Sequence, residues 1–165
     1  MSKKFLATMC ATAMLAAAAT TMVSADYTAP DGVDPSEYHL AICIHSMDNE
    51  YWAQEATGAQ LAAEYYGVNA DILTCDSDDN KQMQGIKDYI AQYGDKAIFV
   101  VDPSSTANTV NIAETCDEAG VYVSILAHRA EGLYPTDYPH FVASLMLDDM
   151  AIGKATASAL FEAIC

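Results

Sequence analysis

Residues 40–67 read LAICIHSMDNEYWAQEATGAQLAAEYYG, and this stretch decides the fold class. An apolar strand at residues 40–44 runs into a short polar and aromatic loop. The loop opens a segment with apolar residues near helical spacing, which stops at Gly67, a residue typical of helix C-termini. A strand that leads directly into a helix is the building unit of parallel α/β sheets, and ligands of open α/β sheets bind where such strands end.

The same alternation of strand and helix continues along the chain. The apolar pattern predicts five strands and four helices. The strands are expected at residues 39–44, 68–74, 97–101, 121–126 and 141–147, and the helices at 50–66, 81–93, 106–119 and about 150–164. The sequence therefore predicts a three-layer α/β fold, in which an open parallel sheet carries helices on both faces and the crossovers are right-handed.

The first 25 residues have the features of an export signal. Two lysines precede an apolar run, and small residues occupy the positions that a signal peptidase reads before residue 26. We predict a signal peptide over residues 1–25, an extended leader over 26–38 and one lobe over 39–165; a buried N-terminal helix is the alternative for the first segment. The apolar run is shorter than the about 20 residues that span a bilayer, so we expect an exported protein of the periplasm or cell surface.

Charge and cysteine spacing exclude several classes of partner. The formal net charge is −16, and it becomes −18 without Lys3 and Lys4. Such an acidic surface repels phosphates and anionic lipids, so we expect neither nucleic acid nor a membrane surface as partner. The mature chain keeps four cysteines whose spacing fits no zinc pattern, and we expect buried free thiols rather than a disulfide framework. They are Cys43, Cys75, Cys116 and Cys165.

Motifs for enzymatic chemistry are missing from the sequence. No glycine-rich phosphate motif is present, which disfavours a nucleotide enzyme. Residues 76–80, DSDDN, begin like a calcium loop, but lysines stand where that loop needs glycine and glutamate. No nucleophile elbow surrounds the serine pair that follows the third expected strand. We therefore predict no cofactor, no metal and no catalysis; the alternative is a secreted α/β hydrolase with His45 or His128 as its base.

Polar and aromatic side chains instead follow successive strands. Because parallel strands end at the same edge of a sheet, we expect these side chains to line one site. Arginine and aspartate form paired hydrogen bonds with neighbouring hydroxyls, and aromatic faces pack on the C–H side of a sugar. The set lacks an activated nucleophile, so we predict binding of a sugar or sugar-like molecule without chemistry. The candidate ligand-binding residues are His45, Asn49, Tyr51, Trp52, Asp102, His128, Arg129 and Asp148.

An ordered series of short motifs carries a family resemblance from about Leu40 to Ile164. The motifs are SMDNEYW at 46–52, GAQ at 58–60, CDS at 75–77, VDP at 101–103, GVYV at 120–123 and LDDMAIG at 147–153. This series resembles the periplasmic sugar-binding proteins of the ribose/galactose type, which share their fold with the effector domains of LacI-type repressors. The resemblance implies the first lobe of a two-lobed, monomeric binding protein that closes on its ligand by hinge motion and delivers it to an ABC transporter permease.

The resemblance also suggests where this chain contacts its ligand. The family's asparagine-aromatic-aromatic element falls on Asn49, Tyr51 and Trp52. Its aspartate-arginine pair falls on His128 and Arg129, so a histidine replaces the carboxylate. The resemblance further implies that the chain is truncated and lacks a second lobe, and a single lobe should bind weakly or not at all. A ligand-sensing subunit for a membrane receptor or kinase is the alternative that the resemblance leaves open.

Overall fold

The computed structural model describes residues 27–128, 130, 132–146 and 149–164. The predicted signal peptide lies outside the described residues. So do Arg129 and Asp148, two of the predicted ligand-binding residues, and Cys165. Among the helices of the described part, none is both long and apolar enough to cross a membrane.

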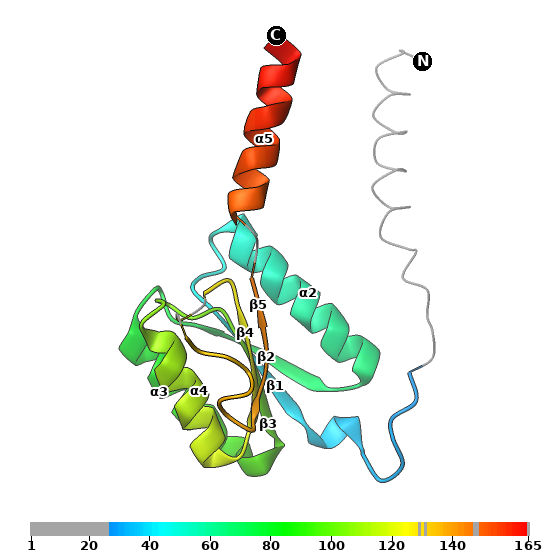
Figure 1. The fold of residues 1–165 in the computed structure, drawn as a ribbon. Coiled ribbons are helices and arrows are strands. Elements are labelled where there is room, and N and C mark those ends of the chain that lie inside the picture. Colours follow the sequence, from blue (N-terminus) through cyan, green and yellow to red (C-terminus); the bar gives the residue numbers. More distant parts are fainter. Residues whose placement is uncertain (1–26, 129, 131, 147–148, 165) are drawn as a thin grey trace, which may run out of the picture.

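Five strands form a single parallel sheet (Figure 1). The strands are β1 (His39–Ile44), β2 (Asn69–Thr74), β3 (Ala97–Val101), β4 (Tyr122–Leu126) and β5 (Phe141–Leu145). Their order across the sheet is β2-β1-β3-β4-β5, and every neighbouring pair is parallel. The chain thus leaves β1 in one direction to reach β2 and returns past it to β3, which confirms the predicted open parallel sheet.

Helices cover both faces of the sheet, as predicted (Figure 1). Helix α2 (Glu50–Tyr66) packs over β1 and β2, whereas α3 (Asp79–Tyr93) and α4 (Asn108–Ala119) lie on the opposite face. Helix α5 (Asp149–Ile164) extends away from the carboxyl edge of the sheet. Its described side chains are exposed. The carboxyl edge, where the candidate residues were expected, is therefore the end of the sheet from which α5 projects.

Local capping sets the ends of the first helices. Asn49 accepts a hydrogen bond from the Tyr51 amide at 2.9 Å and begins α2, and Gly67 ends it with a φ of +73°. Asp78 accepts from the amides of two residues in the first turn of α3, which therefore begins at Asp79 rather than at 81. Aspartate is among the residues preferred at this position, because its carboxylate accepts from amides that have no partner within the helix.

Two other segments differ from expectation. Helix α4 begins at Asn108 rather than at 106, and Ala107 at its N-cap position makes no side-chain capping bond. The leader, expected to be extended, contains the short 3-10 helix η1 (Pro35–Glu37), which Asp34 caps through the Ser36 amide. A proline at the first helical position favours such a turn, because its ring already has a helical φ. A second 3-10 turn, η2 (Gly94–Lys96), follows α3.

The core lies on both sides of the two central strands. Ile42 of β1 is 1% exposed and packs under α2, while Phe99 of β3 belongs to the larger cluster under α3 and α4. The α2 side of β4 and β5 is less well covered, and there Tyr122 is 54% exposed and Leu145 is 64% exposed. We call this surface the bare sheet face.

The cysteines in the described part are buried free thiols, as the sequence predicted. Cys43, Cys75 and Cys116 are free, and burial raises the pKa of each thiol, to about 12 for Cys116. A thiol with so high a pKa is almost entirely protonated at neutral pH and is a poor nucleophile. The buried cysteines are therefore structural rather than reactive.

Candidate ligand-binding site

Three loops meet at the carboxyl edge of the sheet and bring four of the predicted residues together. His45 follows β1, Asp102 follows β3, and His128 comes two residues after β4. Since β1, β3 and β4 are neighbours in the sheet, these three side chains converge, and Trp52 from the first turn of α2 joins them. The sequence expectation that strand-end residues would cluster at this edge holds for these four.

Asp102 is the buried centre of the group. Its side chain is 1% exposed, and its Oδ1 accepts a hydrogen bond from Nδ1 of His128 at 2.8 Å. Its Oδ2 lies 3.7 Å from Nε2 of His45, but no hydrogen-bond partner for Oδ2 is found among the described residues. Asp102 therefore positions His128, and its direct contact with a ligand stays a prediction.

His45 is held by contacts on all sides. Its Nε2 lies 3.0 Å from the Pro103 carbonyl, which can only accept, so Nε2 donates. Its Nδ1 lies 2.9 Å from the Ser77 hydroxyl, which can donate or accept. The imidazole stacks on Trp52 at a centroid distance of 4.5 Å and an interplanar angle of 2°, and the His128 ring lies 5.9 Å from it. The three rings form a layered wall at the edge of the sheet.

Two turns with unfavourable backbone conformations aim these side chains. Ala127 has a φ of +55°, and the His128 amide closes a γ-turn by donating to the Leu126 carbonyl at 2.5 Å. Asp76 and Ser77 have φ values of +52° and +60°. Non-glycine residues in this left-handed region are costly, and such strain concentrates at functional sites. The sequence gave no sign of these turns, because no glycine marks them.

A buried amide fixes the loop that carries Asp102. Gln82 of α3 donates from Nε2 to the Asp102 carbonyl at 2.9 Å, and its Oε1 accepts from the Ser104 amide at 2.9 Å and from Nδ2 of Asn108 at 3.1 Å. The hydroxyls of Ser104 and its neighbour Ser105 both donate to Asp79. These serines therefore hold the loop in place.

An open pocket of about 390 Å³ lies beside the ring wall. Its lining residues are Tyr51, Glu55, Leu126, Ala127, Leu145 and Met146. Oε2 of Glu55 is buried and has no hydrogen-bond partner in the described part of the chain. Burial raises the pKa of Glu55, and a hydrogen bond from Tyr51 opposes this effect. Sequence reasoning missed Glu55; the available signal was its place one helical turn after Tyr51, on the same face of α2.

The other predicted residues lie at the border of this site. Asn49 is exposed, and its side-chain oxygen is occupied in capping α2. Tyr51 is 44% exposed at the mouth of the pocket. His140 lies at the opposite edge of the sheet, where it pairs with Asp117 at 2.7 Å, and so does not join the group.

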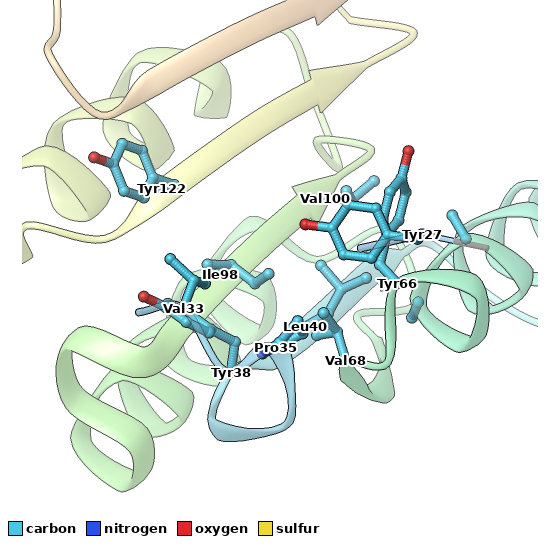
Figure 2. A pocket seen from close by; sticks show the side chains of 12 residues that line it. Tyr27, Val33, Pro35, Tyr38, Leu40, Tyr66, Val68, Ile98, Val100 and Tyr122 are labelled. Atoms are coloured by element: carbon cyan, nitrogen blue, oxygen red, sulfur yellow. The ribbon is translucent and has the colours of Figure 1, made fainter. Parts of the chain in front are cut away.

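A second pocket, of about 510 Å³, lies on the α2 side near the amino edge of the sheet (Figure 2). Its lining side chains come from the leader, from α2 and from the strands, and include Tyr38, Tyr66, Ile98 and Val100. The lining is almost entirely apolar. A site for a polar solute needs several convergent polar groups, so the pocket at the carboxyl edge is the better candidate.

Solved structures similar to this chain include periplasmic solute-binding proteins. No protein-family model and no curated protein matches the chain. A twin-arginine translocation pathway signal protein from Burkholderia phytofirmans is 31% identical, with a TM-score of 0.72 over 79% of this chain. A periplasmic solute binding protein of an ABC transporter from Actinobacillus succinogenes, with bound D-allose, is 18% identical, with a TM-score of 0.65 over 77% of this chain. The Caulobacter myo-inositol binding protein, bound to myo-inositol, is 19% identical, with a TM-score of 0.62 over 83% of this chain.

The chain has the fold of the periplasmic sugar-binding proteins. The resemblance that the sequence motifs indicated is confirmed. This chain spans 40% to 44% of the length of those three solved structures. The share corresponds to one five-stranded sheet with its helices.

Proposed function

We propose that this chain is the ligand-binding lobe of an exported solute-binding protein, which captures a sugar or sugar-like small molecule for an ABC importer without catalysing a reaction. The observation that carries the proposal is the ring wall of Trp52, His45 and His128 beside a pocket at the carboxyl edge of a parallel sheet. Similar solved structures with bound D-allose and myo-inositol support this class of ligand.

The chemistry of the site suits a polyhydroxylated ring. Such a ring has an apolar C–H face and a rim of hydroxyls, and it needs a flat surface together with donors and acceptors. Tyr51 and Trp52 offer the flat surfaces. Because Nδ1 of His128 donates to Asp102, its Nε2 is left to accept from a solute hydroxyl, and the Glu55 carboxyl offers a further acceptor at the pocket.

Several contacts argue against hydrolysis. The serines nearest the site donate to Asp79, and both nitrogens of His45 lie within hydrogen-bonding distance of protein oxygens. The described cysteines are buried with raised pKa values. A covalent mechanism needs a nucleophile beside a base, and the serines, which donate to Asp79 rather than to a histidine, and the buried thiols do not provide one among the described residues.

We further propose that a second lobe completes the cleft and that a hinge closes it. The pocket is open on one side, and sugar-binding sites bury most of their ligand's surface. The chain by itself should then bind its solute only weakly, at about millimolar concentration, because it provides one wall of the cleft. A single lobe is also expected to be monomeric.

Tryptophan fluorescence tests the proposal directly, because Trp52 is the sole tryptophan and lies in the ring wall. The chain would be titrated with a panel of monosaccharides and inositols in a buffer that contains a metal chelator. We expect a saturable, weak response to a subset of the panel, lost in His128→Ala and kept in His140→Ala, whose histidine lies at the opposite edge. A response that is unchanged in His128→Ala, or lost equally in His140→Ala, would contradict the proposal. Micromolar affinity would refute the need for a second lobe.

A further inference from the structure

We propose that His45, Asp102 and His128 form a binding site for a divalent transition-metal ion such as Zn²⁺. One ligating atom of each residue lies within 4.8 Å of those of the other two. The sequence predicted no metal, because these residues are far apart in the chain and match no metal motif. This inference shares His128 with the proposed solute site, but it rests on His45 and Asp102, whose side chains are 7% and 1% exposed, and on zinc binding rather than on solute binding.

The separations between the donor atoms fit a tetrahedral ion. Bonds of about 2.0–2.2 Å from zinc to nitrogen and oxygen place neighbouring ligand atoms roughly 3.3 Å apart. Nε2 of His45 lies 3.7 Å from Oδ2 of Asp102, and Nδ1 of His128 lies 2.8 Å from Oδ1. These two values lie on either side of the tetrahedral separation but involve different oxygens of Asp102, and the three ligand atoms lie within 4.8 Å of one another, so coordination of one ion requires the side chains to rotate toward it.

An unpaired carboxylate oxygen points to a missing cation. Oδ2 of Asp102 is buried in a side chain that is 1% exposed, and no described residue hydrogen-bonds to it. Buried acceptors without partners are rare in native proteins and usually mark a bound water or ion. Oε2 of Glu55 is a second such oxygen. The pKa of Glu55 responds to the charges of Asp102, His45 and His128, so the two acids and the two histidines act on one another.

The contacts behind the histidines are those that a metal ligand needs. A ligating imidazole usually donates its second N–H to a neighbouring oxygen, which fixes the tautomer. The Ser77 hydroxyl, 2.9 Å from Nδ1 of His45, can accept that proton and leave Nε2 free for the ion. The Pro103 carbonyl lies 3.0 Å from Nε2 in the direction of its proton, so an ion bound to Nε2 replaces this hydrogen bond, and the carbonyl oxygen moves aside or becomes a further ligand. The strained turn at residues 76–77 thus holds Ser77 where a metal site requires it.

The donor set selects the class of metal. Two imidazole nitrogens and one carboxylate oxygen suit zinc, copper or nickel, whereas calcium and magnesium prefer sites made of oxygen atoms. Three protein ligands leave a fourth tetrahedral position open, as in zinc sites that bind water or a substrate. That position would take a water or an oxygen of a bound solute.

Calorimetry with ZnCl₂ and absorption spectroscopy with Co²⁺ test the site on the chelator-treated chain. We expect one ion per chain and Co²⁺ bands without a thiolate-to-cobalt band. His128→Ala should weaken zinc binding at least about 30-fold, within the range for losing a metal-site contact, and Asp102→Asn should do the same. His140→Ala is the matched control, because it removes a histidine that pairs with Asp117 in a similar way at the opposite edge of the sheet. This variant should bind zinc as tightly as the unmodified chain does.

Three results would overturn the inference. They are the absence of zinc binding, zinc affinity that is unchanged in His128→Ala, and a thiolate-to-cobalt band that reports cysteine ligation. The His128 side chain is 35% exposed, so His128→Ala should fold even where Asp102→Asn does not, and circular dichroism checks both. Because the sugar titration uses a chelator, failure of zinc binding and failure of sugar binding are separate outcomes.

Discussion

Replacing Ala127 with glycine should stabilise the protein while weakening the site. Ala127 has a φ of +55°. An L-residue in the left-handed region costs about 1–2 kcal/mol, and glycine avoids this cost. Glycine adds about 0.5–1 kcal/mol of conformational entropy to be lost on folding. The difference leaves Ala127→Gly more stable by about 0.5–1 kcal/mol.

The same substitution on a regular helix should have the opposite sign. Ala62 is exposed in α2, where Ala62→Gly should cost about 1 kcal/mol. At this chain length 1 kcal/mol corresponds to about 4 °C in Tm. Thermal unfolding followed by circular dichroism should therefore show a Tm that is about 2–4 °C higher for Ala127→Gly and about 4 °C lower for Ala62→Gly.

The zinc affinity of Ala127→Gly shows whether the strained turn at Ala127 also helps to position the metal ligand His128. A glycine at 127 makes the γ-turn that positions His128 more flexible. Zinc binding must then supply part of the conformational entropy cost of ordering this turn. An extra 0.5–1 kcal/mol corresponds to zinc affinity about 2- to 5-fold weaker. If Ala127→Gly lowers Tm as Ala62→Gly does, then the turn is not strained and the reasoning fails.

Three further predictions concern packing and charge. Ile42→Ala should lose about 2–5 kcal/mol of unfolding free energy in urea, because it opens a cavity under α2, whereas the exposed Val142→Ala should change little. Burial raises the pKa of Glu55, so the stability of the protein falls as the pH rises from the ordinary glutamate range through this higher pKa. Glu55→Gln should therefore raise Tm at neutral pH and leave Tm unchanged in acid. Glu64→Gln, at an exposed position, should leave Tm unchanged at both pH values. Gln82→Ala removes the buried hydrogen-bond partner of the Asp102 loop and should lower the free energy of unfolding in urea by about 1–3 kcal/mol. It should also weaken zinc binding, and an unchanged zinc affinity would contradict a role of Gln82 in holding this loop.

The sequence predicted most of the elements because their signals are local. Apolar runs bounded by Gly67, Gly94 and Gly120 give strand and helix limits that agree with the structure to within about two residues. The helix starts show the largest of these differences, two residues at both α3 and α4, because apolar spacing alone does not locate the first turn; at α4 the N-cap residue Ala107 makes no capping bond. Local signals therefore locate element centres better than helix starts.

The candidate site was only partly predictable, because chemistry at a strand end does not reveal burial or backbone geometry. His45 and His128 meet because β1, β3 and β4 are neighbours; the alternation of strands and helices predicts that their ends share one edge, but not this order. Nothing in the sequence indicates that Asp102 is buried or that Ser77 reaches His45 from a turn with positive φ. Asn49 shows the same limit, since an asparagine before a helix fits a cap and a ligand contact equally well.

The bare sheet face changes what a hydrophobic dye reports about this protein. Tyr122 of β4 and Leu145 of β5 are exposed there, and apolar surface of this kind binds dyes such as anilinonaphthalene sulfonate. Dye binding is normally a sign of a molten globule, in which side-chain packing has been lost. Here the native chain should increase the fluorescence of the dye before any heating, while its near-ultraviolet circular dichroism remains that of a packed protein. A bright dye signal would then describe the surface of the folded state rather than an intermediate.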